Sequence, residues 1–238
     1  DTRDNAAQSM YARVGSKYVK MVTALSFAQP EILSLPEDKL AAIVNDPAVA
    51  EYKFNLEDLL RSKPHTLTKA EEKLLASFGE VMSAPSEIYH NLEDADMVFD
   101  AVKNGEGETV EVTGSNFVPL EMSTDRTLRE NAFHSYYKSY RQHINTFAAS
   151  YSGAVKAAAA EAAARSYPSS RAMSMAGENV PVEVYDNLVA TVRKHMPAMH
   201  RYVRLRKKML GVDALHFYDV YAPLVGDLKK TYSYETAQ

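Results

Sequence analysis

Apolar residues recur at helical spacing through most of the chain. Near the start, positions three or four residues apart are apolar: Met10, Val14, Tyr18, Met21 and Leu25. This spacing is that of one helix face. Farther along, an aromatic stripe follows the same rule: Phe133, Tyr137, Tyr140, Ile144, Phe147 and Tyr151. The stripe predicts one long helix over about residues 125–165, whose aromatic face is core rather than a ligand box.

Polar residues mark where several helices begin and end. The segments SLPE at 34–37 and TKAE at 68–71 have the capping-box form, a hydroxyl followed three residues later by a carboxylate. Asp46 precedes Pro47, a pair typical of an N-cap and the first helical position. A further helical stretch over about 182–210 is expected to bend at Pro197 and to stop at Gly211.

One segment, Gly105 to Leu120, interrupts the helical pattern with strand character. Val110 and Val112 alternate with polar residues between glycines, so we expect at most a short strand or turn near 109–113. The GEG at its start does not match a nucleotide loop, because Val110 stands where the third glycine belongs and Glu106 and Glu108 would repel phosphate. The fold class is therefore all-α.

Composition narrows the setting. The 238 residues include no cysteine, which excludes disulfides and thiolate chemistry and fits a cytoplasmic location. No apolar run approaches the roughly 18 to 20 residues of a membrane span, so no membrane partner is expected. The chain begins without methionine and stops at YSYETAQ, where a helical segment is starting. We expect it to be a piece of a longer protein.

Charge is distributed unevenly along the chain. Residues 1–125 hold 22 acids and 11 bases, whereas residues 126–238 hold 9 acids and 16 bases. Seven arginines and lysines and no acid lie between Asn187 and Val212, with a stripe along one helix face formed by Arg201, Arg204 and Lys208. Such a helix suits nucleic acid. Because the isoelectric point is near 6.0 and no nucleic-acid motif is present, acidic surface elsewhere in the same molecule is a sufficient partner for these bases, and nucleic acid is not expected.

Sequence motifs for catalysis are absent from the chain. None of its seven histidines is followed by glutamate, so there is no H-E-x-x-H. His195 and His200 are five residues apart, about 140° around a helix, whereas two ligands of one metal need a spacing of three or four. No G-x-S-x-G and no P-loop occurs. We therefore expect no metal and no catalytic residue in this chain.

Five segments, in order, carry a resemblance to a known family: SFAQPEILSLPE, KPHTLTKAEEKLLA, STDRTLRENAFHSYY, NTFAASYSGAVK and MHRYVRLRKKMLGVDALHFYDVYAPL. Together they resemble the upstream half of oligoendopeptidase F, a zinc metallopeptidase related to thimet oligopeptidase. The likeness extends over nearly all of the chain, and the last segment is the most specific.

The resemblance implies a helical lobe that forms one wall of a channel in a larger two-lobe enzyme acting on short peptides. In that family, zinc bound by an H-E-x-x-H helix and a later glutamate activates the attacking water. Those ligands would belong to a catalytic half outside this chain, and zinc is expected only in the parent enzyme. On this basis 1–120 is an N-terminal helical segment, 121–211 a long-helix segment and 212–238 a junction toward the catalytic domain.

The segment LHFYDVYAPL has two interpretations. His216, Tyr218, Asp219 and Tyr221 either face the peptide channel or belong to a packed lobe junction. In the second case, which we favour, Asp219 holds backbone or a basic residue, and Phe217 and Tyr221 are buried. For the whole chain, a non-enzymatic helical scaffold or binding module is the alternative to a peptidase lobe.

Overall fold

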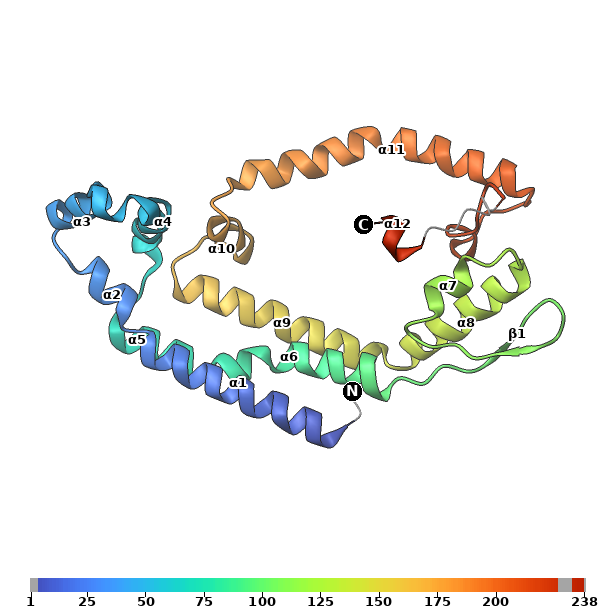
Figure 1. The fold of residues 1–238 in the computed structure, drawn as a ribbon, viewed down its shortest axis with the longest axis horizontal. Coiled ribbons are helices and arrows are strands. Elements are labelled where there is room, and N and C mark those ends of the chain that lie inside the picture. Colours follow the sequence, from blue (N-terminus) through green and yellow to red (C-terminus); the bar gives the residue numbers. More distant parts are fainter. Residues whose placement is uncertain (1–3, 227–232, 238) are drawn as a thin grey trace. The chain divides into compact units, whose positions relative to one another are not determined.

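The computed structural model describes residues 4–226 and 233–237, and its regular structure there is helical except for one two-stranded hairpin (Figure 1). The all-α prediction is therefore confirmed. The chain forms two compact units, each built from two separate stretches. The first combines the described residues up to Asp96 with Asn145–Leu188. The second combines Met97–Ile144 with the described residues from Val189 onward.

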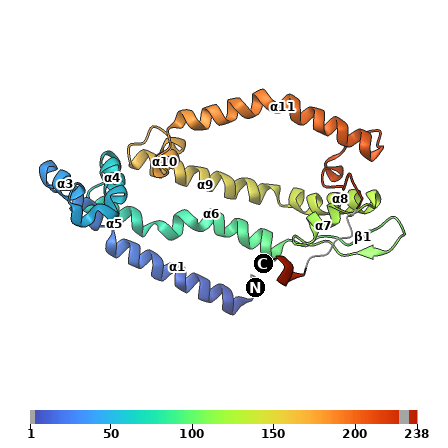
Figure 2. The same cartoon turned by 45° about the horizontal axis from the view of Figure 1, so that its top comes forward.

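The first unit is a set of helices with short connections. Its elements are α1 (Asn5–Leu25), α2 (Ala28–Leu33), α3 (Glu37–Val44), the 3₁₀ helix η1 (Pro47–Tyr52), α4 (Lys53–Ser62), η2 (Lys63–His65), α5 (Lys69–Ser77), α6 (Gly79–Asn91), the π-helical turn η3 (Leu92–Asp96), α9 (from Ile144 to Ala164), α10 (Ser170–Gly177) and the first turns of α11 (Val182–Leu210). Helix α1 packs beside α5 and α6, as two views show (Figures 1 and 2).

Two of the three predicted helix starts have the expected caps. The Thr68 side chain and Glu71 form a capping box on α5, and the Asp46 carboxylate accepts a hydrogen bond from the Ala48 amide at 2.8 Å. The predicted box at Ser34 is wrong. Pro36 is the N-cap of α3, and the Ser34 hydroxyl donates backward to the Glu31 carbonyl at 2.7 Å. Its nearest acceptor closes the preceding helix, so it does not cap the following one.

Helices α6 and α9 approach each other through small residues. A Cβ added at Gly153 would meet Pro85 Cγ at 3.0 Å, and the buried Ser150 hydroxyl donates to the Pro85 carbonyl. The Phe147 ring meets Tyr89 at 5.7 Å between centroids. The contact face of α9 is thus largely small rather than aromatic, which lets the two backbones come close.

The predicted single helix over 125–165 is wrong, because the helix is interrupted at His143. Helix α8 (Arg126–Gln142) ends there and α9 begins at Ile144. His143 has a ψ of 14°, outside the helical range, and a nitrogen of its ring lies 2.9 Å from the Ser139 carbonyl. The break also leaves part of the aromatic stripe outside the core: Ile144 is 59% exposed and Tyr151 74% exposed.

The second unit combines the hairpin with helices. Its elements are β1 (Val102–Lys103), β2 (Thr109–Val110), α7 (Phe117–Glu121), α8, the rest of α11, the 3₁₀ turn η4 (Phe217–Asp219) and α12 (Tyr234–Ala237). The strands are antiparallel, with Val102 opposite Val110. The short strand expected near 109–113 is present at 109–110, and its partner at 102–103 was not predicted.

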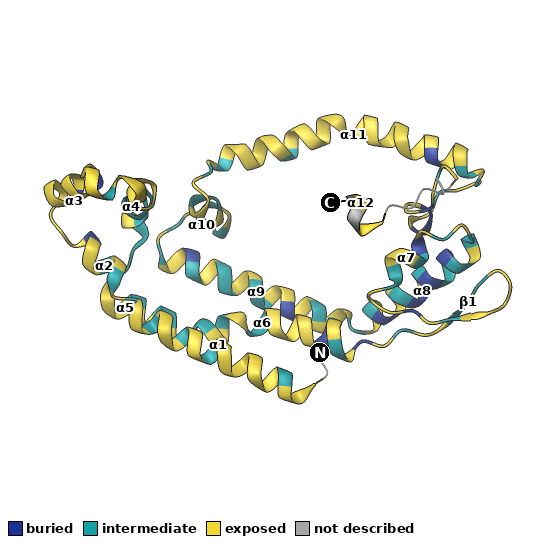
Figure 3. Ribbon diagram, viewed as in Figure 1, coloured by how far each residue is buried: buried dark blue, intermediate teal, exposed yellow. Residues whose placement is uncertain are grey.

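Buried positions in the second unit are unusually polar. Among the described residues of this unit, five apolar side chains are buried, and six polar or charged ones accompany them: Glu121, Arg129, Ser135, Ser139, Arg206 and Asp219. Figure 3 shows that α11, by contrast, is exposed over most of its length. A buried charge is costly unless it is paired. The four buried charged residues, Glu121, Arg129, Arg206 and Asp219, are therefore expected to form a cluster of paired charges.

Candidate functional site: a buried arginine and carboxylate cluster

The predicted site segment follows α11 and forms η4. Tyr218 and Asp219 are buried, 5% and 0% exposed, whereas His216 is exposed. Phe217 and Tyr221 are 79% and 54% exposed within this chain, and their burial at a junction with a further domain stays a prediction. In a three-residue turn, successive side chains point in different directions, and only those of Tyr218 and Asp219 reach the interior.

The Asp219 carboxylate receives four hydrogen bonds. The Arg126 guanidinium is bidentate, with Nε 3.1 Å from Oδ1 and Nη2 3.1 Å from Oδ2. Arg129 Nη2 donates to Oδ1 at 2.9 Å, and the His216 amide donates to Oδ2 at 3.0 Å. Both carboxylate oxygens are therefore occupied. Charge-assisted, bidentate pairs of this kind are the stronger hydrogen bonds in proteins.

The two arginines share a helix face because they are three residues apart at the start of α8. Asp125 caps that helix, accepting from the amides of Thr127 at 2.9 Å and Leu128 at 3.3 Å. Its other oxygen accepts from the Gly105 amide at 2.6 Å. One carboxylate thus begins α8 and ties the hairpin loop to it.

Arg129 also holds backbone on both sides of the cluster. Its Nε donates to the Tyr218 carbonyl at 2.9 Å, and its Nη1 donates to the carbonyls of Ser123 at 2.8 Å and Thr124 at 3.2 Å. The loop before α8 and the turn η4 are therefore joined through one buried side chain.

A third arginine reaches η4 from α11. Arg206 Nη2 donates to the carbonyls of Asp219 at 2.9 Å and Ala222 at 2.6 Å. Helix α11 ends at Leu210, and Gly211 follows it with a φ of 66°, a left-handed conformation that glycine adopts most easily. The Val212 amide then bonds back to the Lys207 carbonyl at 3.4 Å. This turn brings the chain back beneath Arg206.

Tyr218 packs its ring among aromatic and cationic groups. The Arg126 guanidinium carbon lies 5.2 Å from the ring centroid, and the His216 ring stacks at 4.9 Å. Phe133 of α8 meets the same ring edge to face at 5.9 Å. These contacts seat η4 on α8.

Burial raises the pKa of Asp219, but hydrogen bonds from Arg126, the His216 amide and Arg129 outweigh burial, so the net pKa is lowered. Glu121, at the end of α7, is affected in the opposite direction. Its side chain is 1% exposed, and burial raises its pKa to about 7, with Asp219 adding to the rise and Arg129 opposing it. Among the described residues, Glu121 Oε1 has no hydrogen-bond partner.

This geometry makes Asp219 an anchor. An ionised carboxylate with both oxygens occupied and no exposed surface is not available to accept a proton from a substrate. The partners are those that the junction interpretation expected of Asp219. The placement of His216 and Tyr221 along a peptide channel stays a prediction.

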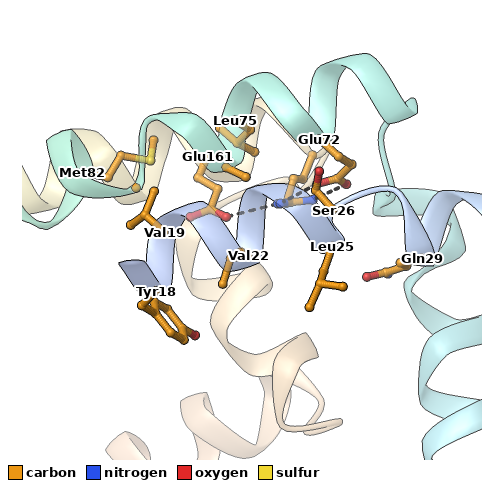
Figure 4. A pocket seen from close by; sticks show the side chains of 13 residues that line it. Tyr18, Val19, Val22, Leu25, Ser26, Gln29, Glu72, Leu75, Met82 and Glu161 are labelled. Carbon is orange, nitrogen blue, oxygen red and sulfur yellow. Dashed lines mark hydrogen bonds and ion pairs between the residues drawn. The ribbon is translucent and has the colours of Figure 1, made fainter. Parts of the chain in front are cut away.

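A second feature, which the sequence did not reveal, is a cavity of about 520 Å³ in the first unit (Figure 4). Figure 4 shows Val22 and Leu25 of α1 and Leu75 of α5 along its wall. At its polar part, Arg165 Nη1 pairs with Glu72 at 2.8 Å and Arg165 Nε pairs with Glu161 at 3.1 Å. The charged groups of the cavity therefore neutralise one another in part, and no ligand chemistry stands out.

Metal-binding side chains do not gather in the described part of the chain. No group of three or more histidine, aspartate, glutamate or cysteine residues there is placed to hold a metal ion. The described residues therefore do not supply a set of ligands for the zinc that the sequence resemblance implies for the parent enzyme. In the same residues, no helix combines the length and apolarity of a membrane span.

Comparison with known families decides the relationship. Residues 31–99 match the model of Oligopeptidase F, and residues 120–238, which include all three arginines and Asp219, match that of Peptidase family M3. The chain belongs to peptidase family M3. The resemblance to oligoendopeptidase F is thereby confirmed.

Relatives of this family M3 chain resemble it along its entire length. Oligopeptidase PepF of Bacillus subtilis is 38% identical over 100% of the chain, and so is Group B oligopeptidase PepB of Streptococcus agalactiae. The crystal structure of oligoendopeptidase-F from Enterococcus faecium covers 97% of the chain with a TM-score of 0.91 and 36% identity.

The chain spans only part of these relatives. It covers 36% of the B. subtilis protein, 39% of the S. agalactiae protein and 44% of the E. faecium chain. Membership of family M3 is thus established for this chain. The activity of a whole peptidase involves further residues that the chain does not include.

Proposed function

We propose that this chain is the helical substrate-channel lobe of an oligoendopeptidase that hydrolyses short peptides. The observation that supports this most strongly is the unbroken likeness to proteins named oligopeptidase, 38% identity over the whole chain. In the proposal, zinc and the groups that cleave the peptide bond belong to the portion of the relatives that the chain does not span. The cytoplasmic location favoured by the cysteine-free sequence is part of the same proposal.

Within such a lobe, the arginine cluster has a mechanical role. Asp219, Arg129 and Arg206 hold η4 against α8 and α11 through buried, charge-assisted hydrogen bonds. In this proposal, they fix the position of the segment that follows α11, so that the surface of the lobe keeps one conformation. No proton transfer or bond cleavage is assigned to them.

The experiment uses the full-length natural polypeptide that carries this sequence. Internally quenched peptides of about five to twenty residues are offered alongside a folded protein. We expect cleavage of the short peptides, inhibition by a metal chelator, and an intact folded protein. A polypeptide that binds peptides without cleaving any would instead favour the non-enzymatic binding module, and rapid cleavage of the folded protein would contradict a channel for short substrates.

A further inference from the structure

Helix α11 carries a concentrated set of exposed positive charges in the second unit. After Asp186 it contains no acidic residue, and six of its seven later bases are exposed. We call these six the basic face: Arg193, Lys194, Arg201, Arg204, Lys207 and Lys208. None of them forms an ion pair with another described residue.

The helical repeat places these bases on one side. At 100° per residue, the six fall within an arc of about 140°. Arg206 falls on the opposite side, and it is the one base of this stretch that is buried, against the carbonyls of Asp219 and Ala222. The contacts of Arg206 therefore fix how α11 is rotated about its axis. The side that bears Arg206 faces η4, and the basic face lies on the side away from η4.

The composition of the basic face favours a peptide over other anionic partners. Between Arg193 and Lys208, His200 is the one aromatic ring inside this arc, and Tyr202 lies about 80° beyond its edge, so the face offers a single ring rather than a row of platforms for stacking successive bases. Arg206 holds the opposite side of α11 against η4 at its C-terminal end, which is the side that a membrane-bound helix would bury.

The length of the face also suits a peptide. From Arg193 to Lys208 the helix rises about 22 Å, the span of about seven residues of extended chain. Guanidinium groups bind carboxylates with two parallel hydrogen bonds, which a flexible acidic side chain can accept. An oligopeptide with several acidic residues matches both the sign and the length of the face.

We propose that the basic face of α11 binds acidic side chains of the peptide substrate and so determines a preference for acidic oligopeptides. The inference rests on the proposed function, and it adds a substrate class to it. Exposed ion pairs are individually weak and are screened by salt. The preference is therefore expected to be cumulative and to decline as ionic strength rises.

The test uses the full-length polypeptide and two quenched octapeptides that differ only in three positions outside the cleaved bond, glutamate in one and glutamine in the other. The ratio of kcat/KM for the two peptides is measured at about 50 and 500 mM salt. The test variant is Arg201→Gln/Arg204→Gln/Lys208→Gln. A matched control, Arg13→Gln/Lys17→Gln/Lys20→Gln, removes three exposed charges from α1 instead.

We expect a ratio of about ten for the wild type at low salt, falling toward one at high salt, and a ratio of about two or less for the α11 variant. The control variant should keep the wild-type ratio. Arg201→Lys/Arg204→Lys, which retains the charges, should keep most of the preference, and this separates charge from packing. A ratio that is unchanged in the glutamine variant, or that falls equally in the control, overturns the proposal.

Binding separates failure of this inference from failure of the proposed function. If the wild type cleaves neither octapeptide, fluorescence anisotropy of the labelled pair is decisive. Tighter binding of the glutamate peptide that disappears in the α11 variant supports the basic face as a peptide site. Equal binding of the two peptides, or tighter binding of a single-stranded oligonucleotide or an anionic vesicle through the same residues, refutes it.

Discussion

Replacing Asp219 with asparagine isolates the charge at the centre of the buried cluster. Asparagine has nearly the same shape, but its amide nitrogen faces guanidinium donors and it carries no charge to offset them. Arg129, whose side chain is 4% exposed, would stay buried without its partner, and Arg126 would lose a bidentate contact. Removing one member of a buried ion pair costs about 3–5 kcal/mol. We expect a loss of that size in local stability.

Hydrogen exchange followed by mass spectrometry measures this loss where it occurs. At about 1.4 kcal/mol per factor of ten, amides of 215–224 and of the start of α8 should exchange about two to four orders of magnitude faster in Asp219→Asn. The control is Asp213→Asn, an exposed carboxylate on the same connection. Affinity for a short peptide should stay close to that of the wild type.

The reasoning fails if exchange in Asp219→Asn differs from that in Asp213→Asn by less than about threefold, 0.7 kcal/mol. It fails most clearly if, in addition, kcat/KM for a short peptide falls tenfold or more. That pair of results would place Asp219 along the peptide channel and would make its contacts with Arg126 and Arg129 incidental to stability.

Two further changes probe the second and first units. Because the pKa of Glu121 in the folded protein is about 7, above its ordinary 4.5, the free energy of unfolding of the wild type should decline as pH rises from about 4.5 to 7. Glu121→Gln should therefore raise the free energy of unfolding by up to about 3 kcal/mol at pH 8 and leave it unchanged at pH 4.5. Urea unfolding at the two pH values measures this, with Glu106→Gln as the control. A gain independent of pH would contradict this. Phe147→Ala should cost about 1.5–3 kcal/mol through its half-buried contact with Tyr89; a melting temperature equal to that of the wild type would show that this contact is not stabilising.

Features that depend on neighbours within about five residues were predictable from the sequence. The Thr68 capping box, the Asp46 cap and the Gly211 stop each rest on hydrogen bonds to nearby backbone. The break at His143 was missed because nothing in the periodicity marks it: the apolar spacing continues across it, and a polar histidine lies off the stripe. The paired strand at 102–103 is too short to show alternation.

The sequence predicted which segment contains the site, but not the residues that contact it. Tyr218 and Asp219 were singled out, yet the arginines that hold Asp219 lie 93 and 90 residues upstream, and only folding brings them together. A signal was present in the pair Arg126 and Arg129, two bases on one helix face directly after an aspartate cap. The raised pKa of Glu121 had no such signal, because burial alone causes most of it.

The measurement that tests the central claim most directly compares residues 1–238 with the full-length natural polypeptide. Each is dialysed, its zinc content is determined, and its cleavage of a quenched oligopeptide is followed with and without chelator. We predict stoichiometric zinc and chelator-sensitive cleavage for the full-length polypeptide, and neither for residues 1–238. One tightly bound zinc ion with cleavage by residues 1–238 alone, or no cleavage by the full-length polypeptide, would contradict the account.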